Sequence, residues 1–161
     1  MDYGVWYGKV RAFFARHPFY LSVLRGYNRY FPPIIALLYA GVLVWRRTGP
    51  WGSYLWLPAL GFVLLSYIRK QVNLPRPYET WDMSPLISRE SQGKSMPSRH
   101  VFSASLLSMV LLQVSGTLGL LFLVLSLGLA SARVLGGVHY PKDVLVGYLL
   151  GLLWGSLLYL F

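Results

Sequence analysis

Residues 101–132 read VFSASLLSMVLLQVSGTLGLLFLVLSLGLASA, a run of 32 residues without a charged side chain. As one helix this run would be about 48 Å long, whereas the hydrocarbon core of a bilayer is about 30 Å thick. Near its middle, Ser115, Gly116 and Thr117 are residue types that favour a turn. The stretch therefore predicts two membrane-spanning helices joined by a tight turn.

Three further uncharged runs lie outside this hairpin, at residues 30–45, 48–68 and 144–161. Each can span a membrane if the charged residues at its ends are held in protein rather than lipid. We therefore predict an all-α integral membrane protein, one domain over residues 1–161 with a bundle of about five transmembrane helices. In the last run, Gly147, Gly151 and Gly155 recur every four residues, which favours close packing inside this bundle over dimerisation.

Residues 1–30 have a different pattern and predict an amphipathic helix at the membrane interface, because apolar residues alternate with basic ones at helical spacing. The residues of the apolar face are Trp6, Val10, Phe13, Phe14 and His17. We expect this helix to break at Pro18. We expect Pro32 and Pro33 to begin the first span, because proline is tolerated in the first turn of a helix.

The composition supports a membrane protein and limits its partners. Hydrophobic residues make up 55% of the chain and charged residues only 12%, which is far from a soluble domain. The net charge of +10 indicates membrane lipids with anionic headgroups or phosphorylated ligands as partners, and not nucleic acid, because the charge lies on no soluble face. The absence of cysteine excludes disulfides, thiolate nucleophiles and thiolate metal sites.

Ionisable residues gather at the ends of the uncharged runs, where they are costly and are usually kept for function. They form three segments, Arg69-Lys70 to Arg76-Pro77, Pro97-Ser98-Arg99-His100, and Arg133 with His139 and Asp143. Five spans place all three segments on one side, with residues 71–99 as an ordered, non-helical active-site loop rich in proline. Four other charged residues of this loop are interpreted as solvated: Glu79, Arg89, Glu90 and Lys94.

These residue types suit phosphoryl transfer. His139 and Asp143 are four residues apart and can share one helical face, where the carboxylate fixes the imidazole tautomer. His139 is then a candidate nucleophile toward phosphorus, and His100 is a candidate general acid for the departing oxygen.

A phosphoryl group also needs several fixed cations and hydrogen-bond donors. The residues predicted to bind the phosphate are Arg69, Lys70, Arg76, Ser98, Arg99 and Arg133. Carboxylates are few among these cations, so we expect neither a metal ion nor another cofactor.

The three segments resemble the signature motifs of the type 2 phosphatidic acid phosphatase superfamily of integral membrane lipid phosphatases, which is related to vanadium haloperoxidases. The first family motif is Lys, six residues, then Arg-Pro, and here Arg69 takes the lysine position with Lys70 one residue later. The second is Pro-Ser-Gly-His, in which Arg99 replaces the glycine. The third is Ser-Arg, five residues, His, three residues, Asp, in which Ala132 replaces the serine.

This resemblance implies a phosphohistidine intermediate on His139, with Asp143 orienting the ring and His100 as the acid, in a multi-pass protein of the bacterial cell membrane. We predict a metal-independent hydrolase that removes a terminal phosphate from a lipid phosphate or pyrophosphate. Undecaprenyl pyrophosphate is favoured, because Arg99 adds a cation for a second phosphate. Phosphatidylglycerophosphate, phosphatidate and diacylglycerol pyrophosphate are the alternatives, as is phosphoryl transfer to a second lipid.

A second class of function is a non-catalytic anionic-lipid binding protein or transporter, which would need the cations but not the pair His139 and Asp143. The span interiors contain almost none of the polar residues that a transporter requires. The sequence leaves the membrane side of the site open. The distribution of Lys and Arg favours the cytoplasm, whereas undecaprenyl pyrophosphate phosphatases of this superfamily are expected to face outward. The oligomeric state is also open.

Overall fold

The computed structural model describes residues 3–45, 51–90 and 92–160, and in these ranges it contains helices and loops but no strand. The elements are α1 (Tyr3–Arg16), α2 (Pro18–Trp45), α3 (Trp51–Val72), α4 (Pro77–Thr80), α5 (Arg99–Val114), α6 (Gly116–Leu135), α7 (Pro141–Ser156) and the 3₁₀ helix η1 (Leu157–Leu160). The all-α prediction is confirmed. The parts of the predicted spans and of the predicted interfacial segment that fall on residues 1–2, 46–50 and 161 lie outside the described residues.

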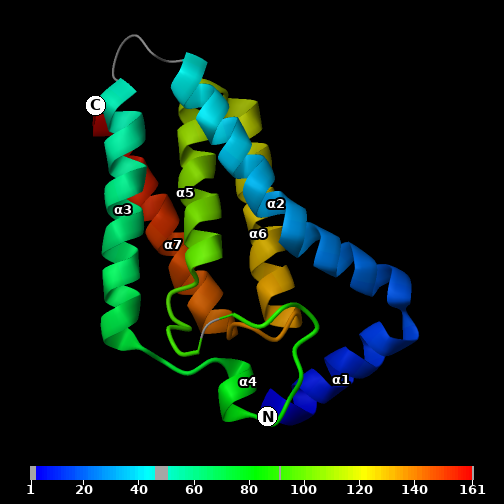
Figure 1. Ribbon diagram of the computed structural model, residues 1–161. Helices are drawn as coiled ribbons and strands as arrows, with labels where there is room; N and C mark the ends of the chain where they lie inside the picture. The colour runs from blue at the N-terminus through cyan, green and yellow to red at the C-terminus, as the bar shows by residue number, and fades with distance from the viewer. Residues whose placement is uncertain (1–2, 46–50, 91, 161) are drawn as a thin grey trace.

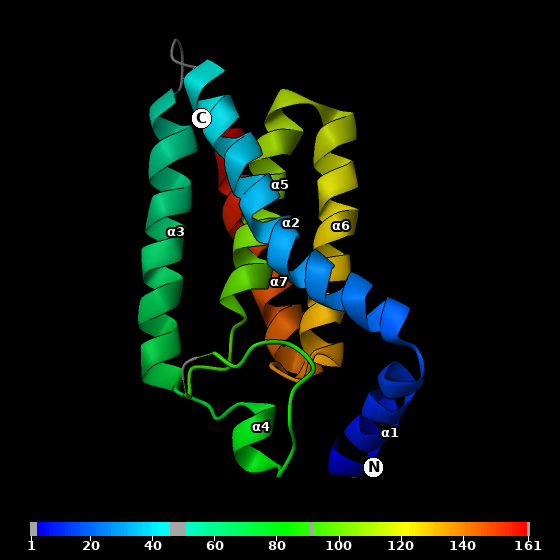
Figure 2. The ribbon, with the colours of Figure 1, turned by 45° about the vertical axis from the view of Figure 1, so that its right-hand side comes forward.

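The predicted hairpin forms the centre of the fold. Ser115 is both the C-cap of α5 and the N-cap of α6, and its hydroxyl accepts a hydrogen bond from the Leu118 amide at 3.4 Å. Figures 1 and 2 show α5 in the interior of the bundle, with α2, α3, α6 and α7 around it. Most side chains of α5 between Val101 and Leu111 are buried, so packing positions its N-terminus where the charged motifs meet.

The glycine face of α7 packs against α5, as predicted. A Cβ atom added at Gly147 would lie 2.6 Å from the Ser98 carbonyl oxygen, and one added at Gly151 would lie 1.9 Å from the Ser105 hydroxyl. Only residues without a side chain allow the two backbones to approach this closely. The small-residue stripe therefore serves internal packing and fixes the height of α7 against α5.

The N-terminal part of the chain differs from the prediction. The break after α1 falls at His17, as expected, but α2 begins at Pro18 and continues through Pro32 and Pro33. The expectation that these prolines lie in the first turn of a helix is wrong. Phe31 and Ile35 flank them and are buried in one apolar cluster, so tertiary packing maintains the helix despite the hydrogen bond that each proline removes.

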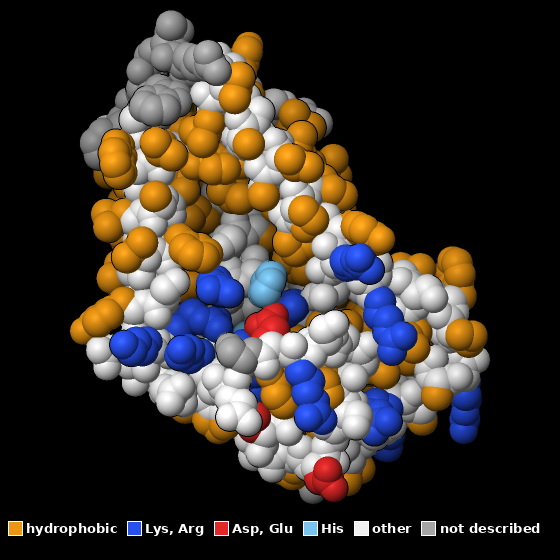
Figure 3. All heavy atoms as spheres, in the orientation of Figure 1, with side chains coloured by type: hydrophobic (Ala, Val, Ile, Leu, Met, Phe, Trp, Pro, Cys, Tyr) orange, Lys and Arg blue, Asp and Glu red, His pale blue; other side chains and the backbone are white. Residues whose placement is uncertain are grey.

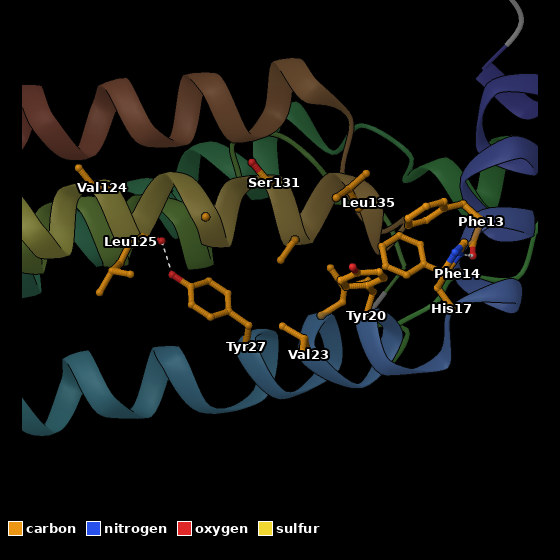
Figure 4. Close-up of a pocket in the computed structure, with 13 residues that line it drawn as sticks. Phe13, Phe14, His17, Tyr20, Val23, Tyr27, Val124, Leu125, Ser131 and Leu135 are labelled. Atoms are coloured by element: carbon orange, nitrogen blue, oxygen red, sulfur yellow. Dashed lines mark hydrogen bonds between the residues drawn. The ribbon is translucent and has the colours of Figure 1, made fainter.

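Helix α1 turns sharply away from α2 and lies across the end of the bundle (Figure 2). Where α1 and α2 meet α6, they line an open apolar pocket of about 770 Å³ (Figure 4). Tyr27 crosses from α2 and donates a hydrogen bond to the Leu125 carbonyl of α6 at 2.5 Å, while His17 lies at the far end of the pocket. Phe14 of α1 is buried in one apolar cluster with Ala132 and Val138, which holds α1 against the bundle. The place of α1 at a membrane interface stays a prediction.

Among the described helices, Gly116–Leu135 and Pro141–Leu160 are long and apolar enough to cross a membrane, and Arg99–Val114 is apolar but shorter. The outer faces of α2 and α3 are also apolar, with Leu37 72% and Trp56 69% exposed. Figure 3 shows hydrophobic side chains over the upper part of the molecule and Lys and Arg side chains over the lower part. This distribution suits a membrane protein; the count of five spans stays a prediction.

Candidate active site

The four helix ends predicted to meet do meet. The C-termini of α3 and α6 and the N-termini of α5 and α7 converge at one end of the bundle (Figures 1 and 2). A cavity of about 480 Å³ lies at this end, lined by Ser66, Arg69, Arg76, Glu90, Lys94, Arg99 and His100. In Figure 3 this face shows basic side chains gathered around a histidine and an acidic side chain.

The described residues of the loop 71–99 cover this end, but they are not wholly non-helical as predicted. It contains α4, a single turn that begins at Pro77. The turn forms because proline suits the first helical position and because the Glu79 carboxylate accepts a hydrogen bond from the Arg76 amide at 2.8 Å. Glu79 also accepts from the Gly93 amide at 2.8 Å, so it ties the loop together and is not simply a solvated charge.

His139 and Asp143 form a buried pair. His139 lies in the turn between α6 and α7, and its Nδ1 is 3.5 Å from Oδ2 of Asp143 in the first turn of α7. The same carboxylate oxygen accepts hydrogen bonds from the Ser95 hydroxyl at 2.5 Å and from the Tyr140 amide at 3.0 Å. Burial lowers the pKa of His139 to about 4, although Asp143 acts in the opposite direction, so the ring is neutral near neutral pH.

The turn that carries His139 depends on Gly137. This residue has φ of +77°, a conformation that favours glycine, and a Cβ atom there would lie 2.3 Å from the Tyr7 hydroxyl of α1. Tyr7 is 1% exposed, and its hydroxyl accepts a hydrogen bond from the Leu86 amide at 3.1 Å. Helix α1 therefore supports the turn from behind.

Arg76 and Arg133 are both buried, 1% and 3% exposed, and Arg76 lines the cavity. Arg76 donates from Nε to the Gly93 carbonyl at 3.1 Å and from one terminal nitrogen to the Val138 carbonyl at 3.3 Å. Arg133 donates to Oδ1 of Asn28 on α2 at 3.0 Å. Both guanidinium groups are thus fixed by contacts from distant parts of the chain.

The structure distinguishes the two cations of the first motif. Arg69 is 7% exposed, lines the cavity and donates to the Pro97 carbonyl, whereas Lys70 is exposed. Successive residues of a helix point about 100° apart, so only one of the two can face α5. Arg69 is the residue brought to the cavity and Lys70 is not.

The second motif begins α5. Ser98 is the N-cap residue, its amide donates to the Asp143 carbonyl at 2.9 Å, and its buried hydroxyl has no hydrogen-bond partner in the described part of the chain. Arg99 is exposed, with its guanidinium carbon 5.5 Å from the centre of the Phe62 ring. His100 is one-third exposed and lines the cavity.

Glu90 corrects the interpretation of the loop charges as solvated. Its carboxylate lies 2.8 Å from a terminal nitrogen of Arg76 and 3.3 Å from Nδ1 of His100, and it also pairs with Arg133. Burial raises the pKa of Glu90, but Arg133, His100 and Arg76 outweigh it and hold the pKa at about 2.

Three residues of the site carried no signal that sequence reasoning could use. Glu90 and Ser95 lie in an aperiodic loop outside the three motifs, and Asn28 lies on α2, far from them in sequence. Lys94, interpreted as solvated, is exposed but lines the cavity, and Arg89 is exposed as expected.

Within the described ranges, no group of three or more His, Asp or Glu side chains could hold a metal ion, and the expected absence of a metal stays a prediction.

Residues 50–161 match the family model described as the PAP2 superfamily. This chain belongs to the PAP2 superfamily. The resemblance predicted from the three motifs is confirmed, and membership supports a phosphoric ester hydrolase.

Two solved structures share the PAP2 fold with this chain. LpxE of Aquifex aeolicus is 22% identical with a TM-score of 0.74, over 91% of this chain and 89% of that one. The first transmembrane PAP2 type phosphatidylglycerolphosphate phosphatase from Bacillus subtilis is 24% identical with a TM-score of 0.65, over 89% of this chain and 76% of that one. The comparison with curated proteins found no match. At these identities the likeness establishes the fold.

Proposed function

We propose that this PAP2 protein is a metal-independent phosphatase that removes a terminal phosphate from a lipid phosphate or pyrophosphate through a phosphohistidine on His139. The proposal includes a multi-pass arrangement in which α2, α3, α5, α6 and α7 cross the membrane and α1 lies at its surface.

One observation carries the lipid nature of the substrate. A second cavity, of about 730 Å³, runs between α2, α3 and α5 and is lined mainly by apolar side chains such as Ile35, Phe62 and Leu107. It shares Arg99 and His100 with the polar cavity. A molecule with a phosphate at one end and a hydrocarbon chain at the other fits the two adjoining cavities, with the ester bond near His100.

In the proposed first step, Nε2 of His139 forms a bond to phosphorus as the bond between phosphorus and the leaving lipid oxygen breaks. His100 gives that oxygen its proton. Asp143 holds Nδ1 and stabilises the charge on the phosphorylated ring. Water then attacks phosphorus with His100 as the base, which releases inorganic phosphate and restores the free Nε2 of His139.

The cations bind the equatorial oxygens during both steps. Buried polar groups are rarely left without a partner, yet Ser98 Oγ, Arg133 Nε and His139 Nε2 have none within the described residues. Ser98 Oγ and Arg133 Nε can donate hydrogen bonds to phosphoryl oxygens, and His139 Nε2 can attack phosphorus. Arg69 would contribute from α3, since it lines the same cavity.

Undecaprenyl pyrophosphate is the favoured substrate. Arg99 lies where the polar and apolar cavities adjoin, so its guanidinium would meet the phosphate nearer the lipid chain. Phosphatidylglycerophosphate is the second candidate, because a protein of the same fold is a phosphatidylglycerolphosphate phosphatase.

The test is phosphate release from undecaprenyl pyrophosphate by the purified protein in detergent with a chelator, beside His139→Ala. His17→Ala is the matched control, because His17 lies between α1 and α2 at a separate pocket (Figure 4). We expect release that survives chelation, disappears in the His139 variant and persists in the His17 variant. Release from phosphatidylglycerophosphate alone would replace the substrate but keep the mechanism. Lipid binding that His139→Ala leaves intact, without hydrolysis, would favour the non-catalytic alternative.

A further inference from the structure

The Glu90 carboxylate takes the hydrogen-bond donors that a phosphate would need. Backbone carbonyls hold two nitrogens of Arg76, and Glu90 holds the third at 2.8 Å. Asn28 holds one terminal nitrogen of Arg133, and Glu90 holds the other. A phosphoryl group bound between the two arginines would therefore compete with Glu90 for the same two nitrogens.

We propose that Glu90 determines substrate specificity as an internal competitor, which a doubly charged terminal phosphate displaces and a singly charged phosphodiester does not. This inference rests on the proposed function and adds a reason for its selectivity. The residue acts by occupying the phosphate-binding position, not by taking part in the reaction.

Charge gives the physical reason. A terminal phosphate carries about −1.5 to −2 near neutral pH, whereas a phosphodiester carries one negative charge, like the Glu90 carboxylate. Exchanging Glu90 for a phosphodiester replaces one monoanion by another, so the arginines gain little. Exchanging it for a terminal phosphate adds a charge beside two buried guanidinium groups. The low pKa of Glu90 keeps it ionised in the physiological range.

An internal competitor is useful here because phosphodiester lipids surround the site. The apolar cavity that adjoins the site is suited to lipid chains, and phosphodiester lipids are the bulk of a phospholipid membrane. Without Glu90, the donors of Arg76 and Arg133 would be free to bind phosphodiester headgroups without turnover. An internal anion of matching charge prevents this occupation.

The geometry also allows the exchange. The Glu90 side chain is 23% exposed, compared with 1% for Arg76 and 3% for Arg133. The Glu90 backbone stays anchored, because Tyr78 donates a hydrogen bond to its carbonyl at 3.0 Å. Side-chain rotation can therefore remove the carboxylate from the arginines while these stay in place.

The first measurement is the dissociation constant of inorganic phosphate by calorimetry in detergent, for the wild type, Glu90→Gln and Asp82→Asn. Asp82 is exposed in the same loop and controls for the loss of one negative charge. We expect phosphate to bind roughly tenfold more tightly to Glu90→Gln and unchanged to Asp82→Asn. Weaker or unchanged binding in Glu90→Gln would overturn the proposal and make Glu90 a support for the arginines.

If Glu90→Gln does not fold, Glu90→Asp is the second variant. It retains the charge with a shorter reach and should still bind phosphate more tightly than the wild type. Weaker or unchanged binding in Glu90→Asp would overturn the proposal.

The second measurement is hydrolysis of the lipid substrate in micelles containing increasing phosphatidylglycerol, a monoanionic phosphodiester. We expect inhibition of Glu90→Gln at concentrations that leave the wild type and Asp82→Asn active. Equal inhibition of all three proteins would contradict the proposal. If none of the proteins hydrolyses any lipid phosphate, the proposed function fails, while the phosphate dissociation constants still decide the role of Glu90.

Discussion

The helical body and the charged end of this protein are held together in different ways. In the body, α5, α6 and α7 pack mainly through apolar side chains and glycines, with a few neutral hydrogen bonds such as that between the Ser108 and Ser126 hydroxyls at 3.2 Å. At the charged end, side chains bind groups far away in sequence: Arg76 reaches a carbonyl 62 residues away, and Ser95 reaches a carboxylate 48 residues away. Substitutions in the body should therefore reduce stability, and substitutions at the charged end should reduce activity.

The largest expected effect is on activity alone. Asp143→Asn should lower kcat by roughly 10³-fold or more, because an amide can no longer fix the His139 tautomer or stabilise its positive charge. The measurement is steady-state phosphate release, with Asp82→Asn as the control. A decrease of less than tenfold would show that the pair is not catalytic.

The second prediction concerns the stability of the helical body. Gly151→Ala should lower the free energy of unfolding by about 1–3 kcal/mol, because the new methyl group meets the Ser105 hydroxyl and the Phe102 carbonyl. Gly41→Ala on α2 is the control: nothing lies within 4 Å of the new atom, and alanine favours the helix. Thermal unfolding in detergent compares the two variants, and equal midpoints would mean that α7 does not depend on this contact.

Ser95 offers a smaller effect at the charged end. Ser95→Ala removes one of the hydrogen bonds that orient Asp143 and should lower kcat about tenfold with little change in KM. The exposed Ser84→Ala in the same loop is the control. An unchanged kcat would mean that the remaining contacts suffice to fix the carboxylate.

The smallest expected effect concerns the pH at which His139 is protonated. Because the pKa of His139 is lowered to about 4, the ring carries its free electron pair at pH 5.5, where an ordinary histidine is mostly protonated. Its protonation is therefore expected only as the pH falls toward 4. Histidine ¹⁵N spectra, assigned with His139→Gln, measure the protonation of this ring directly. A titration midpoint near 6.5 for His139 in the protein without substrate would contradict a pKa lowered by burial.

The same contrast explains what could be predicted from the sequence. The α5–α6 hairpin, the glycine face of α7 and the meeting of the three motifs follow from local patterns and from alternation of helices across the bundle. Local patterns do not predict which of Arg69 and Lys70 faces the cavity, because this depends on how α3 is rotated against α5. The continuous helix through Pro32 does not follow from the sequence either, because packing of α2 overrides a local preference.

Glu90 could not be recognised because its three partners come from three separate segments. Its own loop has no periodicity that would indicate where the side chain points. The charged end thus combines motifs that a sequence reveals with supporting residues that only the fold brings together.

The most direct test of the account is to trap the phosphorylated protein after brief reaction with lipid substrate labelled with ³²P in its terminal phosphate. The account predicts a label that is stable in base, labile in acid, located on the peptide containing His139, and absent from His139→Gln. Phosphate release by the wild type without a labelled protein at any time point, together with continued release by His139→Gln, would contradict the phosphohistidine mechanism.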